Sequence, residues 1–194
     1  MDNRVENLTA CEKCKGICCC SSGCEISLDD LKDFNKEILV KILQTGIISI
    51  DWWEGDPRCD YRGNELLDWK ENIPGEIIEE IKNIPLGLSE CYFLRIKNKN
   101  GKTIDPAWGG ECLLHSISGG KCPIPLEHRP LSAATIIPRD ENHSRCISSK
   151  RYTKKVISLQ YLKFHSIFQE VYFEIGKNYS YKSNSIEELL KYLK

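Results

Sequence analysis

The stretch from residue 11 to residue 24, CEKCKGICCCSSGC, dominates this sequence because it places six of the eleven cysteines within fourteen positions. An ordinary hydrophobic core has no use for so many thiols so close together. Cys11 and Cys14 have the C-x-x-C spacing, which lets two thiolates turn toward one metal ion at about 2.3 Å, the usual Zn–S distance. Gly16 frees the backbone ahead of the next cysteines, where a side chain would crowd the loop. The stretch therefore predicts a metal or cluster site.

The neighbours Cys18 and Cys19 bear on the kind of site. Adjacent side chains usually point in different directions, so one small zinc centre would not use both, whereas a multi-atom cluster or two metals could. A disulfide framework has less support, because residues 1–10 (MDNRVENLTA) lack the apolar segment of a signal peptide and eleven cysteines cannot all pair. Inert buried thiols would not cluster so densely. We therefore expect a cytoplasmic protein with reduced, metal-binding thiols.

Length and charge set the broad class of protein. With 194 residues the chain can bury an ordinary core, and with a net charge of −1 it has no global field that draws it to nucleic acid. Its apolar runs are too short for a transmembrane helix. It has no basic stripe interleaved with aromatic residues, no P-loop, no G-x-S-x-G elbow and no H-E-x-x-H motif. We expect no nucleic-acid partner and no membrane partner.

Apolar periodicity predicts several helices. One is expected to begin at Ser27 and stop at Gly46, and a longer amphipathic helix to run from Tyr152 to Ile175. Shorter helices are expected over residues 76–82 and after Ser185.

The same sequence predicts strands, and with them an α+β fold. Residues 47–53 and 90–97 have strand character, and the turn Asn98–Gly101 would return the chain as a hairpin strand over 102–105. We expect a single compact domain over residues 1–194, in which a small cysteine-rich metal-binding lobe and a β-hairpin pack against several helices. The metal-binding region would cover about residues 11–146 and a C-terminal helical region residues 151–194.

A second cysteine group lies at Cys112 and Cys122, where a Gly119-Gly120 turn can bring both sulfurs to one side of a hairpin. Neither cysteine group supplies a complete ligand set. We therefore expect the two groups to converge on one site, with the sulfur of Cys11 or Cys14 roughly 4 Å from that of Cys112 or Cys122 around a shared metal. Lone histidines more often serve as surface or hydrogen-bonding residues, which is the first interpretation here for His115, His128, His143 and His165.

The two cysteine groups together resemble the YkgJ-type CxxCxxCC cysteine-cluster family of zinc- or iron-chelating proteins, which is related to the flagellin lysine N-methylases. The resemblance spans most of residues 11 to 146 and is loose from 40 to 89. The segments that carry it are Cys11-x-x-Cys14-x-Gly16-x-Cys18-Cys19, Ile26-Ser27-Leu28-Asp29-Asp30-Leu31, Tyr92-Phe93-Leu94-Arg95, Cys112-Leu113-Leu114, Gly120-Lys121-Cys122-Pro123-Ile124 and Arg129-Pro130. It implies a bound metal centre, either zinc or an iron–sulfur cluster of the 4Fe-4S type.

The chain departs from the family pattern just after Arg129-Pro130, where the family has a further cysteine and this chain has alanine at positions 133 and 134. Cys146 could supply the missing thiolate, and two cysteines of the N-terminal loop are spare candidates. The expected metal ligands, ranked by their match to the family, are Cys11, Cys14, Cys18, Cys19, Cys112 and Cys122, then Cys146, then Cys24 and Cys20. Cys59 and Cys91 rank last, as spectators.

The function that follows most directly is that of a metal-binding protein whose clustered cysteines hold an iron–sulfur cluster or zinc. Such a centre would serve a redox role or the modification of a protein or peptide, which would then be its partner. Whether the protein is an enzyme stays open, because no glycine-rich loop for a dinucleotide or adenosyl cofactor is present. The alternative is a redox sensor without permanent metal, in which Cys11 and Cys14 cycle between dithiol and disulfide.

Overall fold

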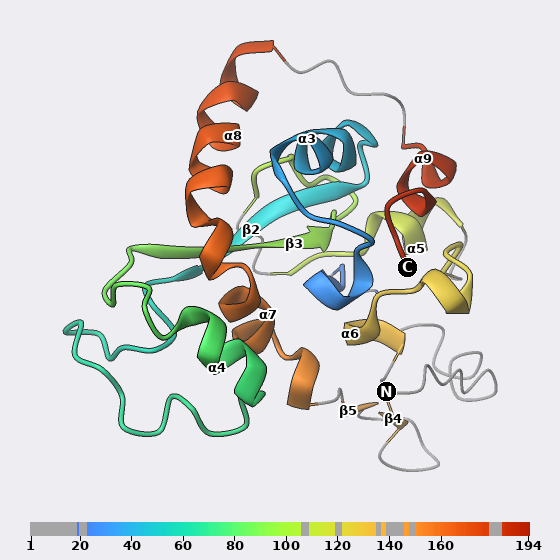
Figure 1. The fold of residues 1–194 in the computed structure, drawn as a ribbon. Coiled ribbons are helices and arrows are strands. Elements are labelled where there is room, and N and C mark those ends of the chain that lie inside the picture. The colour runs from blue at the N-terminus through green and yellow to red at the C-terminus, as the bar shows by residue number, and fades with distance from the viewer. Residues whose placement is uncertain are drawn as a thin grey trace.

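The structure is a computed structural model that describes residues 19, 23–105, 109–118, 122–134, 137–138, 146–147, 150–178 and 184–194 (Figure 1). These residues form a compact α+β domain in which helices surround a small antiparallel sheet, so the predicted fold class is confirmed. Most of the cysteine-rich stretch falls outside the described residues. Among the helices that are described, none combines the length and the apolar character that crossing a bilayer requires.

The described residues form strands, α-helices and single turns of 3-10 helix. The strands are β1 (Glu25–Ile26), β2 (Ile48–Glu54), β3 (Glu90–Ile96), β4 (Ile137–Pro138) and β5 (Cys146–Ile147). The α-helices are α3 (Lys36–Gln44), α4 (Gly75–Ile81), α5 (Leu113–Ile117), α6 (Leu131–Ala134), α7 (Lys154–Gln160), α8 (His165–Asn178) and α9 (Ile186–Leu190). The 3-10 helices are η1 (Leu28–Asp30), η2 (Leu126–His128), η3 (Lys150–Tyr152) and η4 (Leu162–Phe164).

β3 is the central strand of the main sheet, which has the order β1-β3-β2 with both pairings antiparallel. The strands predicted over 47–53 and 90–97 are therefore confirmed. Successive side chains of a strand point to opposite faces. Tyr92, Leu94 and Ile96 accordingly share one buried face, while Arg95 lies on the other, opposite Glu25 of β1.

Helices cover both faces of this sheet, with α3 on one side and α7 on the other (Figure 1). α8 lies against both α3 and β3. A large core cluster joins the sheet to α3 and α8, and includes Leu39, Ile42, Leu94 and Phe168. A smaller cluster joins α4 and α7 to Cys91 of β3. Apolar burial on both faces therefore fixes the position of β3, the strand that carries the site described below.

The helix predicted over residues 27–46 is wrong in its first half. Ser27 caps only η1, where its backbone N–H donates to Asp30 Oδ2 at 2.8 Å in a capping box. α3 begins later, after Asn35, whose Oδ1 accepts from the Ile38 N–H at 3.0 Å. Gly46 has φ of +79°, in agreement with the predicted stop. The apolar spacing runs through both segments, so it concealed the break between them.

The single helix predicted from Tyr152 to Ile175 is also wrong, because α7, η4 and α8 replace it. Every residue of α7 from Val156 to Gln160 is buried, so α7 is a buried helix against the sheet rather than an amphipathic surface helix. The chain turns at Tyr161, whose hydroxyl donates to the Ile26 carbonyl oxygen at 2.9 Å. α8 then runs in a new direction and packs against α3 (Figure 1).

The turn at Asn98–Gly101 forms, but the segment after it does not return along β3. The Gly101 N–H donates to the Asn98 carbonyl oxygen at 2.8 Å. The chain then pairs with β2, since the Ile50 N–H donates to the Thr103 oxygen at 2.7 Å and Ile104 forms a parallel bridge to Ile50. The reason is that β1 and β2 already occupy both edges of β3.

The two shorter predicted helices are present. α4 covers residues 75–81, one residue earlier than the predicted 76–82. α9 begins after Ser185, whose hydroxyl oxygen accepts from the Glu188 N–H at 3.2 Å.

Candidate metal centre

The end of β3 lies between two segments that carry cysteines. On one side, the Ile96 N–H donates to the Cys24 carbonyl oxygen at 2.9 Å. On the other, the Leu113 N–H donates to the Lys97 oxygen at 2.8 Å, and Asn98 forms an antiparallel bridge with Cys112. The central strand therefore holds the N-terminal and the central cysteine segments at the same end of the sheet.

The two segments also contact each other directly. The Cys112 N–H donates to the Cys19 carbonyl oxygen at 2.7 Å. Cys24, Cys112 and Cys122 lie close enough for their charges to act on one another, and all three adjoin the main core cluster. The two cysteine segments therefore lie side by side at this point. The predicted approach of the Cys11 or Cys14 sulfur to Cys112 or Cys122 involves residues outside the described part of the chain.

Burial and crowding control the chemistry of these thiols. Burial raises the pKa of Cys24 well above its ordinary value, and the neighbouring Cys112 and Cys122 raise it further. Burial also raises the pKa of Cys112, against the opposing effect of the backbone N–H groups of His115 and Leu114. A bound metal cation reverses this balance, because it stabilises the thiolates that otherwise repel one another.

Among the described residues, no three Cys, His, Asp or Glu side chains are grouped closely enough to hold a metal ion. Cys24, Cys112 and Cys122 therefore do not form a metal site by themselves. Most of the N-terminal cysteines expected to share a site with the central group lie outside these residues.

The remaining predicted ligands are placed only in part. Cys11, Cys14, Cys18 and Cys20 lie outside the described residues. The backbone of Cys146 lies in β5, in the second sheet, where it pairs with Pro138. Cys91, predicted to be a spectator, is fully buried in β3 and packs in the smaller core cluster. Cys59 is half-buried and forms a bridge with Glu65 in the loop before α4.

The hairpin predicted between Cys112 and Cys122 is replaced by a helix. Cys112 is the residue before α5, so the chain coils directly after it. Gly119 and Gly120 lie outside the described residues. His115 on α5 contacts Glu111 through Nδ1 at 3.1 Å.

The other histidines have varied surroundings. His128 Nδ1 donates to the Lys194 carbonyl oxygen at 3.0 Å. The His165 ring packs on Tyr92 with centroids 5.2 Å apart. His143 lies outside the described residues.

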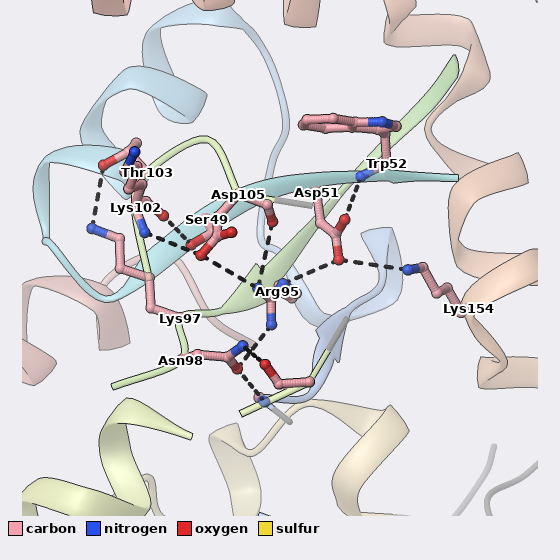
Figure 2. Close-up of polar contacts among 12 residues, drawn as sticks. Ser49, Asp51, Trp52, Arg95, Lys97, Asn98, Lys102, Thr103, Asp105 and Lys154 are labelled. Carbon is pink, nitrogen blue, oxygen red and sulfur yellow. Dashed lines mark hydrogen bonds and ion pairs between the residues drawn. The ribbon is translucent and has the colours of Figure 1, made fainter. Parts of the chain in front are cut away.

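A buried polar network contacts the two cysteine segments at Gly23 and Gly109, and sequence reasoning missed it (Figure 2). Its centre is Arg95, which is 2% exposed. Arg95 Nε lies 3.1 Å from Asp51 Oδ2, and Lys154 Nζ lies 3.6 Å from the same oxygen. Burial raises the pKa of Asp51, while Lys154 and Arg95 act in the opposite direction. On the other side, Arg95 Nη1 donates to Asn98 Oδ1 at 3.0 Å.

A second set of contacts brings the segment after Arg129-Pro130 to the same place. The Leu131 N–H donates to Asp30 Oδ1 at 2.8 Å, and the Ser132 hydroxyl donates to the Glu25 carbonyl oxygen. α6, which contains Ala133, thus packs on β1, the strand that starts directly after Cys24.

Comparison with known proteins adds no assignment. No family model, no curated protein and no solved structure matches the chain.

Proposed function

We propose that this protein binds a metal centre through cysteines of its N-terminal and central groups. The observation that supports the proposal is the contact between the two cysteine segments at the end of β3. There the Cys112 N–H donates to the Cys19 carbonyl oxygen and the Ile96 N–H to the Cys24 carbonyl oxygen. Burial favours the neutral form of Cys24 and Cys112. A bound metal cation would instead stabilise them as thiolates, and coordination would then tie the two segments together.

The donor chemistry limits which metals fit. Thiolates without accompanying carboxylates select zinc or an iron–sulfur cluster and disfavour magnesium and calcium. We propose zinc or a 4Fe-4S cluster. Its ligands would come from Cys24, Cys112 and Cys122 together with Cys11, Cys14, Cys18 or Cys19. The same proposal makes the chain a member of the YkgJ-type cysteine-cluster family, working in the cytoplasm, where thiols stay reduced.

The surroundings of Cys24 favour it over Cys146 as the replacement for the missing family cysteine. In the family that cysteine follows the Arg-Pro pair, and here the position belongs to α6, which packs on β1. Cys24 precedes β1 and acts electrostatically on the pair Cys112 and Cys122. We therefore propose that Cys24 supplies the thiolate that Ala133 lacks, which moves Cys24 above Cys146 in the ranking of ligands.

The role of the centre is the finer part of the proposal. A cluster would carry electrons or take part in the modification of a protein or peptide, as the family resemblance implies, and zinc would order the lobe. A thiol redox sensor is the competing function, and it predicts a protein that is fully ordered without metal.

Metal analysis of protein purified without air tests the proposal. We expect at least one zinc per chain in a colourless sample, or iron and sulfide with a broad brown absorption in the visible range. Cys24→Ser and Cys112→Ser should lower the metal content, because each removes a bond and a charge from the centre. Cys91→Ser is the matched control, since it alters a buried thiol of β3 outside the site.

The metal analysis can also refute the proposal. Wild-type protein that is folded and free of zinc, iron and sulfide would contradict it and favour the redox sensor. Loss of metal from Cys91→Ser, with full occupancy in Cys24→Ser and Cys112→Ser, would show that the site lies elsewhere.

A further inference from the structure

We propose that Asn98 is the positioning residue of the metal centre, held in place by Arg95, and that it fixes the two cysteine segments relative to each other. The inference rests on the proposed function for what the segments bind. The positioning itself rests on the contacts of the amide group, all of which belong to the described part of the chain.

The Asn98 amide connects both cysteine segments at once. Its Oδ1 accepts from the Gly23 N–H at 3.2 Å, the residue directly before Cys24 and 75 positions away in the sequence. Its Nδ2 donates to the Gly109 carbonyl oxygen at 2.7 Å, three residues before Cys112. Asn98 is 7% exposed, so water does not compete for these bonds.

The Asn98 backbone reinforces what its side chain does. The residue forms an antiparallel bridge with Cys112. Gly110 packs directly on the amide, because a Cβ at that position would lie 3.1 Å from Nδ2, and its φ of +129° is one that glycine adopts readily. A single residue at the end of the central strand thus contacts the chain on both sides of the site.

Arg95 orients the Asn98 amide. Its Nη1 donates to Asn98 Oδ1 at 3.0 Å, which identifies that atom as the oxygen and leaves Nδ2 to bond Gly109. Arg95 is itself fixed by Asp51, with Nε 3.1 Å from Oδ2, and by the Asp105 carbonyl oxygen, 3.4 Å from Nη2 (Figure 2). A buried ion pair is costly and adds little net stability. Here the Arg95–Asp51 ion pair holds the guanidinium that orients the Asn98 amide.

This arrangement matches the outer shell of known metal sites. Groups that orient the ligand-bearing segments typically change metal affinity by ten- to a hundredfold when they are removed. Asn98 does this through the backbone at Gly23 and Gly109, and it does not need to touch the metal.

The experiment compares three variants of the full chain. Asn98→Leu removes all three amide contacts with little change in volume. Asn98→Asp keeps the oxygen that accepts from Gly23 and Arg95 and loses the donation to Gly109. Ser49→Ala is the matched control, because it removes a buried hydrogen bond to the Lys102 oxygen, 2.7 Å long, at the same end of the sheet.

Two measurements separate positioning from stability. Zn²⁺ affinity, measured by competition with a chromophoric chelator, should fall about ten- to a hundredfold in Asn98→Leu, less in Asn98→Asp, and stay unchanged in Ser49→Ala. In metal-free protein, hydrogen exchange at the Gly23 amide should be faster in Asn98→Leu than in Asn98→Asp and Ser49→Ala.

Several results would overturn the inference. A folded Asn98→Leu protein with wild-type zinc affinity, or with the Gly23 exchange of the Ser49→Ala control, would do so. If Asn98→Leu does not fold, a zinc affinity of Asn98→Asp equal to that of Ser49→Ala would overturn it as well. If wild-type protein binds no zinc or cluster, the proposed function fails, and the exchange measurement alone decides whether Asn98 positions the two segments.

Discussion

Gly23 shows at the residue scale how closely the N-terminal segment approaches the sheet. A Cβ built on this residue would lie 2.0 Å from the Ile96 carbonyl oxygen and 2.8 Å from its carbon, both backbone atoms that cannot turn aside. Only glycine therefore lets the chain pass at this point and donate its N–H to Asn98. The requirement for glycine at position 23 comes from the backbone of Ile96, 73 positions further along the sequence.

We expect Gly23→Ala to lower the free energy of unfolding by about 1–3 kcal/mol, the usual cost of overpacking. Denaturant titration followed by circular dichroism measures this. Gly75→Ala is the control, because a Cβ at Gly75 would meet nothing within 4 Å and alanine favours the helix that starts there. Equal stability of the two variants would contradict the close approach.

Asn35 decides at the element scale where α3 begins. The sequence predicted a start at Ser27, but Ser27 caps only η1, and Asn35 caps α3. Asn35→Ala should destabilise the protein by about 1 kcal/mol, because the Ile38 N–H loses its acceptor. The midpoint of urea unfolding reports it. An unchanged midpoint would mean that the helix does not depend on this cap.

The long connection from β2 to β3 is held by a buried ion pair. Arg58 Nη2 lies 2.7 Å from Asp56 Oδ2, and the guanidinium also donates to the carbonyl oxygens of Ile84 and Pro85. We expect Asp56→Asn to cost about 3–5 kcal/mol, since it leaves the Arg58 charge buried without its partner. Lys41→Ala, which breaks an exposed pair with Glu37, should cost no more than about 0.5 kcal/mol in the same unfolding assay.

The same pair gives a dependence on pH. Burial acts to raise the pKa of Asp56, but hydrogen bonds and charge from Arg58 outweigh it and hold the pKa below its ordinary value of 3.8. A carboxyl with a lowered pKa in the folded state contributes stability that is present above pH 3.8 and is lost as the pH falls through the folded-state pKa. The difference in unfolding free energy between wild type and Asp56→Asn should therefore shrink on acidification. A difference that stays constant down to pH 2 would refute the assignment.

We expect the whole molecule to combine a core that folds by apolar burial with an N-terminal segment whose order depends on the proposed metal. The core cluster joins α3, α8 and the sheet, whereas residues 1–26 hold few large apolar groups. Removal of the metal with a chelator should accelerate hydrogen exchange first in residues 10–26 and around Cys112, and only later in β2 and β3. Mass spectrometry of exchanged peptides follows both regions. Cooperative, simultaneous exchange of the whole chain would be inconsistent with this division.

The sequence by itself determined the α+β class, the strands at 47–53 and 90–97, and the short helices near 76 and 185. These depend on local patterns: alternation of apolar residues, caps and turn residues act over a few positions. It also predicted that the two cysteine groups converge. The structure shows their segments in backbone contact, from the Cys112 N–H to the Cys19 carbonyl oxygen, and the predicted approach of the Cys11 or Cys14 sulfur stays a prediction.

Only the tertiary structure decided the features that depend on distant partners. The helix predicted over residues 152–175 is interrupted at Tyr161, because α7 is buried against the sheet while α8 packs against α3. Residues 102–105 pair with β2 because both edges of β3 are occupied. In the sequence, Asn98 looks like an ordinary turn residue. Its contacts with Gly23, Gly109 and Arg95 form only because β3 becomes the central strand. Contacts between residues so far apart in the chain produce no periodic pattern in a single sequence. They can therefore be identified only from the tertiary structure.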